Sequence, residues 1–121
     1  NFNAVSQTKF NSRMLPIDNI PFAISTPIKI KENEFDNSLK LNSSKSIFKT
    51  KNYIIKMKSS SKPQHNFLQI YTPPKRSCIA IEPLTCGGNV FNTKDGLLTL
   101  NPNEKYKWKI NLNIKLRKNS L

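Results

Sequence analysis

The sequence has few acidic residues, only two cysteines and no long apolar run, and each shortage excludes a class of protein. Seven Asp and Glu residues stand against 20 Lys and Arg residues in 121, which gives a formal net charge of +13. The spacing of Cys78 and Cys86 does not indicate zinc, because a structural zinc site needs four ligands. Without a long apolar run or a charged-then-apolar leader, we expect neither a membrane span nor a signal peptide.

The two cysteines and the lysines bear on the compartment and on the partners. Cys78 falls in a predicted strand and Cys86 in a loop, and the sequence leaves a disulfide between them open. Two buried or half-buried thiols in a cytoplasmic protein are the simpler interpretation. The lysines are spread along the chain, and many alternate with apolar residues, as solvent-facing positions of strands do. We therefore expect no specific nucleic-acid partner, and only weak binding of polyanions by charge.

Short alternating segments separated by turn signals predict an all-β fold, an antiparallel β-sandwich. The clearest segment is 106–116, where apolar residues alternate with Lys and Asn, which predicts a long strand with one buried and one solvated face. Residues 1–20 show no strong period, residues 14–19 within them are predicted to be a loop with a turn, and no helix is predicted. The other predicted strands cover 35–41, 47–50, 53–58, 67–72, 78–81 and 97–100.

Glu82 is the candidate catalytic residue. Cys78–Ile81 has the pattern of a short buried strand, and Pro83, which has no N–H, is expected to end it so that the backbone turns at Glu82. Alternation places Glu82 on the same face as Cys78 and Ala80, where partial desolvation makes a carboxylate a better base. From the residues alone, an exposed carboxylate or one paired with a lysine is the more common situation.

Asp36 is the second candidate, at the start of the segment 35–41. Leu39 and Leu41 share one face of this segment, so it is predicted to be a short strand opened by a polar turn. An Asx turn, in which the Asp36 side chain bonds its own backbone, is the local alternative. His65, the single histidine, follows a Ser-rich loop and is expected to be an ordinary surface or strand-edge residue.

The segment 69–115 combines several motifs that together resemble the C-terminal end of the aldose 1-epimerases (mutarotases). In that family a strand ending in Tyr-Thr is followed by a strand ending in Glu-Pro and by a loop with an Asn or Asp near an aromatic residue. A Gly-Leu turn and a Leu-x-Pro-(Gly/Asn)-Glu turn then lead into a final long strand. The present sequence has these parts in the same order: IYT, IEP, GGNVF, DGLL and LNPNE.

The resemblance implies that residues 1–121 form a partial domain, the C-terminal part of a galactose mutarotase-like supersandwich. It implies that Glu82 is the base that acts on the anomeric hydroxyl. Asp36-Asn37 resembles a separate pattern of the same family, an Asp followed by Asn or His that opens a strand, which implies that the Asp36 carboxylate contacts sugar hydroxyls. Asn89 lies in the same loop region and is a further candidate for substrate binding. The implied partners are an aldohexose and the missing N-terminal part of the same domain, which supplies the family's catalytic histidine. No metal or organic cofactor is needed.

Two other functions are compatible with the same residues. One is a non-enzymatic carbohydrate-binding β-sandwich that keeps the sugar-facing Asp36 and Glu82. The other is a small basic β domain that binds nucleic acid through its lysines.

Overall fold

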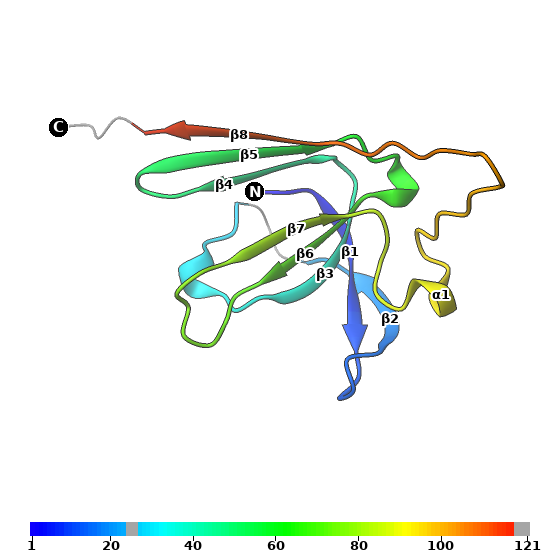
Figure 1. Cartoon of the computed structure of the whole chain (residues 1–121). Coiled ribbons are helices and arrows are strands. Elements are labelled where there is room, and N and C mark those ends of the chain that lie inside the picture. Colours follow the sequence, from blue (N-terminus) through cyan, green and yellow to red (C-terminus); the bar gives the residue numbers. More distant parts are fainter. Residues whose placement is uncertain (24–26, 118–121) are drawn as a thin grey trace.

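The computed structural model describes residues 1–23 and 27–117, which form two antiparallel β-sheets. The larger sheet has five strands in the order β2-β1-β3-β6-β7, and the smaller has three in the order β4-β5-β8. The two sheets lie one above the other (Figure 1), an arrangement consistent with the predicted β-sandwich. The strands are Ala4–Phe10 (β1), Pro16–Pro21 (β2), Asp36–Leu41 (β3), Lys45–Lys49 (β4), Tyr53–Ser59 (β5), Phe67–Tyr71 (β6), Ala80–Leu84 (β7) and Ile110–Leu116 (β8).

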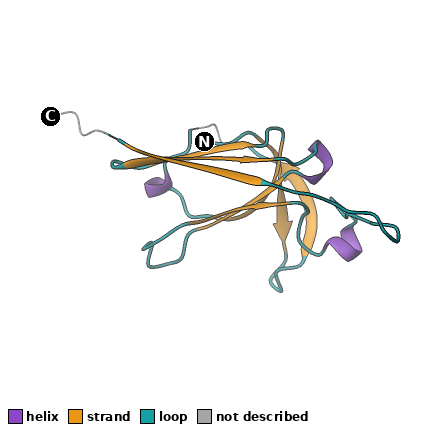
Figure 2. Ribbon diagram, turned by 45° about the horizontal axis from the view of Figure 1, so that its top comes forward, coloured by secondary structure: helices purple, strands orange, loops and turns teal. Residues whose placement is uncertain are grey.

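Among the described residues, helical structure is limited to three single turns, which lie at the periphery of the molecule (Figure 2). They are the 3-10 turns Ile30–Glu32 (η1) and Pro63–His65 (η2) and the α-helical turn Val90–Thr93 (α1). The prediction of no helix therefore missed α1. In the described part of the chain, none of these turns approaches the length and hydropathy that a membrane-crossing helix requires.

The core lies between the sheets and consists mainly of alternate residues of β3 and β6. Leu39 and Leu68 lie opposite each other on these strands and are the two largest fully buried side chains. Ile70 follows on β6, and Met57 of β5 approaches from the smaller sheet. Leu68, Ile70 and Met57 line one small cavity between the two sheets. The predicted strands 35–41, 47–50, 53–58 and 67–72 are thus confirmed, within a residue or two at their ends.

The strand that carries Glu82 differs from its prediction. β7 spans Ala80–Leu84, so Cys78 precedes it and Pro83 lies inside it, opposite Leu68. Because β7 is the edge strand of its sheet, Pro83 can remain in the ladder without donating a hydrogen bond on the outer side. Glu82 therefore lies in the middle of an edge strand and not at a strand end. Both cysteines are free thiols; Cys86 is half-buried as expected, whereas Cys78 is exposed because it precedes the strand, so the burial expected for it is wrong.

The N-terminal segment is a hairpin, which the sequence did not predict. β1 and β2 pair in an antiparallel manner, and the turn between them is closed by a hydrogen bond from the Asn11 N–H to the Leu15 carbonyl. The turn was predicted near the right place, but the strands were not. None of the residues of β1 or β2 is fully buried, so the segment lacks the alternation of apolar residues that identifies a strand.

The C-terminal region was predicted only in part. Residues 97–100 are not a strand, although one was predicted there; they belong to the connection between α1 and β8. β8 begins at Ile110 instead of 106, and every residue in it is exposed, so the predicted buried face is wrong for this structure. The strand lies at the edge of the smaller sheet, and no described residue packs closely enough over its apolar side to bury it.

Candidate functional site

The face of the larger sheet that is turned away from the core carries a row of polar side chains. Glu82 on β7 lies directly opposite Gln69 on β6, and Gln69 lies opposite Ser38 on β3. Gln69 alternates with the core residues Leu68 and Ile70, so it points to the other side of the sheet. Glu82 and Ser38 share that side because residues directly opposite each other in a ladder project to the same face.

Asp36 joins this row through a hydrogen bond. Gln69 Nε2 donates to Asp36 Oδ1 over 3.1 Å, and Asp36 lies opposite Tyr71 in the same ladder. We call Asp36, Gln69 and Glu82 the polar row. The structure therefore brings both predicted carboxylates to one face, with Gln69 between them. Glu82 is exposed, so Ala80 does not shelter it from solvent as we had expected.

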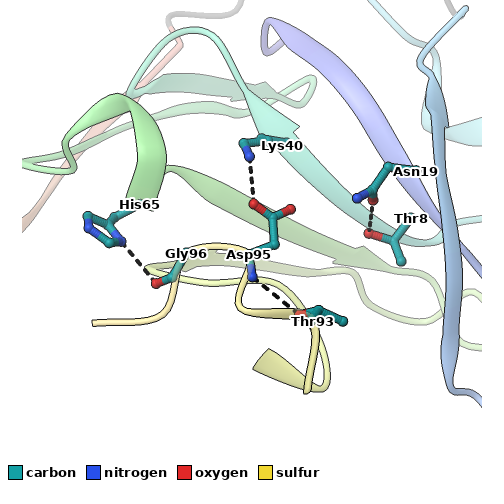
Figure 3. Close-up of polar contacts among 7 residues, drawn as sticks. All are labelled: Thr8, Asn19, Lys40, His65, Thr93, Asp95 and Gly96. Carbon is teal, nitrogen blue, oxygen red and sulfur yellow. Dashed lines mark hydrogen bonds and ion pairs between the residues drawn. The ribbon is translucent and has the colours of Figure 1, made fainter. Parts of the chain in front are cut away.

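The far end of this face is covered by residues 85–97, here called the covering segment. Beneath it lies Phe67 of β6, which is buried. Lys40 of β3, directly opposite Phe67, places its Nζ 5.3 Å from the ring centroid and 2.6 Å from Asp95 Oδ1 of the covering segment (Figure 3). Gly96 lies against the same ring with a φ of +81°, and a Cβ at that position would come within 2.7 Å of Phe67 Cε2. The covering segment thus packs against Phe67 and is also held to the sheet by the ion pair between Lys40 and Asp95.

His65 provides a second tie to the covering segment. Its Nδ1 lies 2.9 Å from the carbonyl oxygen of Gly96, within hydrogen-bonding distance (Figure 3). Its ring also meets Tyr106 edge-on, with 6.4 Å between the ring centroids. His65 therefore contacts the covering segment and the approach to β8, and it is not part of the polar row.

Asn89 opens the helical turn α1 within the covering segment. Its backbone is in the left-handed region, with φ 54°, and its carbonyl accepts the N–H groups of Asn92 and Thr93 at 3.0 Å. Its side-chain Oδ1 accepts a hydrogen bond from Asn92 Nδ2 at 2.7 Å. The described contacts of Asn89 are therefore those of a helix start, and its contact with substrate stays a prediction.

A cleft of about 250 Å³ lies between the β1–β2 hairpin and the covering segment. We call it the β1–β2 cleft. On one wall Thr8 Oγ1 donates to Asn19 Oδ1 at 3.0 Å, and on the other lies Asp95, held by Lys40 (Figure 3). The residues that give the cleft its polar character are Thr8, Asp18, Asn19, Gly88, Thr93 and Asp95.

Sequence reasoning did not identify Gln69 or the residues of the cleft. Gln69 carried a usable signal, since it is the polar member between Phe67 and Tyr71 on a strand predicted to neighbour that of Glu82. Thr8 and Asn19 carried none, because they meet only once β1 and β2 pair.

A larger groove of about 610 Å³ lies between the two sheets. It is lined mainly by apolar side chains, among them Ile55 of β5, Ile81 of β7 and Leu112 of β8. Ile81 alternates with Glu82, so the groove is on the opposite side of β7 from the polar row. None of the described residues that line it is a carboxylate. The two candidate carboxylates, Asp36 and Glu82, are therefore on the other side of the larger sheet from this groove.

Comparison of the chain with protein-family models, with curated proteins and with solved structures found no match in any of the three. Among residues 1–23 and 27–117, no group of three or more His, Cys, Asp and Glu side chains is placed to hold a metal ion. A functional proposal therefore depends on the sequence motif and on the arrangement of the polar face.

Proposed function

We propose that this chain is the C-terminal part of an aldose 1-epimerase-like protein, which interconverts the α and β anomers of a hexose. The observation that supports the proposal is that Asp36 and Glu82, the two carboxylates implied by the resemblance, lie on one face with Gln69 between them. Their strands are two strand spacings apart, about 10 Å across the sheet. A sugar ring above Gln69 is therefore within reach of both side chains.

Glu82 is the base in this proposal. Its carboxylate takes the proton of the anomeric hydroxyl while the C1–O5 bond breaks, and an acid delivers a proton to the ring oxygen. Rotation about C1–C2 then presents the other face of the aldehyde, and the reverse transfers close the ring as the other anomer. The exposure of Glu82 on an open face gives a substrate direct access to its carboxylate.

Asp36 and Gln69 position the sugar. The Asp36 carboxylate accepts hydrogen bonds from sugar hydroxyls, and Gln69 Nε2 holds that carboxylate in place. The Gln69 side-chain oxygen is a further acceptor for a hydroxyl. Fixing the ring in this way brings the anomeric hydroxyl to Glu82 in a reactive orientation, which accounts for a large share of the rate in reactions of this kind.

The acid is assigned to a segment outside this chain. The polar row consists of two carboxylates and an amide, and the nearby Lys40 is already paired with Asp95. His65, the single histidine, contacts Gly96 instead. This arrangement also fits a second function, a carbohydrate-binding β-sandwich without catalysis, because binding needs the polar row but not an acid.

Polarimetry on freshly dissolved α-glucose or α-galactose tests the assignment of Glu82. In the chain joined to a histidine-bearing N-terminal part, we expect Glu82→Gln to remove ~10²–10⁴-fold of the acceleration, the usual contribution of a positioned base. Glu34→Gln makes the same chemical change at another exposed glutamate and is expected to leave the rate unchanged. A folded Glu82→Gln variant with the parental rate would remove Glu82 from the mechanism.

The same measurement on the chain by itself separates the alternatives. We expect no acceleration from the chain alone, because the polar row of Asp36, Gln69 and Glu82 contains no general acid that could protonate the ring oxygen. A monomeric chain that accelerates mutarotation well above the buffer rate would show that the acid lies within these residues. Sugar binding without acceleration in the joined protein would favour the carbohydrate-binding alternative. Tight binding of DNA or RNA at physiological salt would favour a nucleic-acid-binding domain.

A further inference from the structure

The β1–β2 cleft opens on the same face of the larger sheet as the polar row. Lys40 and Gln69 both project to that face, since Lys40 lies opposite Phe67 and Gln69 is two residues further along β6. Asp95, the partner of Lys40, lines the cleft. Ser6 lies opposite Lys40 on β1, so Thr8, two residues on, projects to this face as well. The polar row and the cleft therefore lie on the same face of the sheet, with the buried Ser38 of β3 between them.

The chemistry of the cleft suits a neutral, hydroxyl-rich ligand. Thr8 and Thr93 offer hydroxyl groups, Asn19 an amide and Asp18 a carboxylate, which are the donors and acceptors that sugar hydroxyls pair with. The charge of Asp95 is compensated by Lys40 at 2.6 Å. Although the chain has a net charge of +13, neither Lys nor Arg is among the described residues that line this cleft. An anion therefore meets no unpaired cation among the described residues that line this cleft.

Apolar surface completes the cleft. Pro16 and Ile17 lie at its wall beside the polar groups, and Ile17 is exposed. Sites for small molecules combine such apolar surface with a few polar groups that fix orientation. The cleft, at about 250 Å³, is smaller than the roughly 300–1,000 Å³ of sites for drug-sized ligands, which suits a single sugar ring.

The spacing of strands decides how long the ligand must be. Glu82 is on β7 and Thr8 on β1, and these strands are three spacings apart in the sheet, or about 14 Å. A single hexose on the polar row does not extend over that distance, whereas two linked rings do. From this spacing and the lining of the cleft, we infer that the β1–β2 cleft binds the second ring of a neutral disaccharide. This inference rests on the proposed function, which places the first, reducing ring over Glu82.

NMR titration of the ¹⁵N-labelled chain tests the inference, with glucose, maltose and cellobiose as probes. We expect at least one disaccharide to bind roughly tenfold more tightly than glucose, the gain from one or two added hydrogen bonds. That disaccharide, but not glucose, is expected to shift the amide signals of Thr8, Asn19 and Gly88. Asn19→Ala should remove the advantage of the disaccharide, whereas Asn42→Ala, at an exposed asparagine outside the cleft, should keep it.

A second variant guards against loss of the hairpin, since Asn19 also bonds Thr8. Asp18→Asn keeps the size of the side chain and is likewise expected to weaken the disaccharide while leaving glucose unaffected. Equal affinity for all three sugars, or no effect of either variant, would overturn the inference, as would inorganic phosphate shifting the same amides as strongly.

The outcome for the cleft is separable from that for the base. Signals that shift only around Gln69 and Glu82 with every sugar overturn the role of the cleft and leave the role of Glu82 standing. The converse result is also possible. If a disaccharide shifts amide signals both in the cleft and around Gln69 and Glu82, but Glu82→Gln keeps the parental polarimetric rate, the proposed reaction is rejected. In that case the cleft remains a sugar-binding site.

Discussion

The two sheets are built from the same alternating pattern, and yet only one of them is well buried. On β3 of the larger sheet, Leu39 and Leu41 are 0% and 5% exposed, whereas on β8 of the smaller sheet Leu112 and Leu116 are 61% and 79% exposed. Alternation determines that a segment is a strand and which residues share a face. Burial depends on what lies opposite that face, which no single segment contains.

The edges of the two sheets differ in the same way. β2 begins at Pro16 and ends at Pro21, and β7 contains Pro83, so both edges of the larger sheet are interrupted by proline. In the smaller sheet, Ile47 of β4 exchanges backbone hydrogen bonds of 2.6 and 2.7 Å with Asn1. β8 contains no proline, and within residues 1–23 and 27–117 no strand pairs with its outer edge. The smaller sheet is therefore the one with an open edge and an open apolar face.

The largest expected effect comes from truncating one leucine in each sheet. Leu39→Ala leaves a cavity in the core and is expected to lower the free energy of unfolding by about 2–5 kcal/mol. Leu116→Ala removes an exposed side chain and is expected to change it by less than about 0.5 kcal/mol. Chemical denaturation of both variants measures the difference. Similar losses for the two would show that β8 is buried in solution and would remove the contrast between the sheets.

A smaller effect is expected from the covering segment, which is packed on the larger sheet. Gly96→Ala puts a Cβ 2.7 Å from the Phe67 ring at a φ of +81°, and we expect a loss of about 1–3 kcal/mol in the free energy of unfolding. Gly88→Ala is the matched control, because its Cβ would make only ordinary contacts of 3.6 Å and 3.7 Å with Phe10 and Pro16. Thermal unfolding distinguishes the two. If Gly96→Ala is as stable as the control, the segment does not pack on Phe67.

The smallest effect on stability, with a clear effect on association, is expected at β8. Ile114→Lys places a charge on the exposed apolar face and is expected to reduce self-association of the chain, with little change in stability. Asn113→Lys adds the same charge to the opposite face of the strand and is expected to leave association through the apolar face in place. Sedimentation velocity over a range of concentrations measures both. An equal reduction in the two variants would mean that net charge, and not the apolar face, controls association.

The same contrast explains which parts of the fold could be predicted from the sequence. β3 and β6 were predicted because their apolar residues alternate and are buried. β1 and β2 were not, because their side chains lie at the surface or at half-buried positions and carry no apolar period. The burial predicted for β8 was wrong because the alternation is present but nothing among the described residues covers it.

The sequence identified individual candidate residues of the site, but it did not predict how they are arranged relative to one another. The family resemblance pointed to Asp36 and Glu82, and neither residue revealed that Gln69 lies between them, since this depends on how three strands pair. The boundary of β7 was wrong for a related reason. Proline ends a central strand but is tolerated in an edge strand, and the position of a strand within its sheet is not a local property.

Pro83, which misled the prediction of β7, also sets the direction in which the sheet can be extended. A strand added outside β7 would find no N–H donor at the residue next to Glu82, so a regular ladder cannot form there. Backbone from any other chain is thereby kept from the margin of the polar row. The edge of the larger sheet beside Glu82 therefore stays accessible to small molecules. A strand from another chain is expected to pair with the open edge of β8 instead.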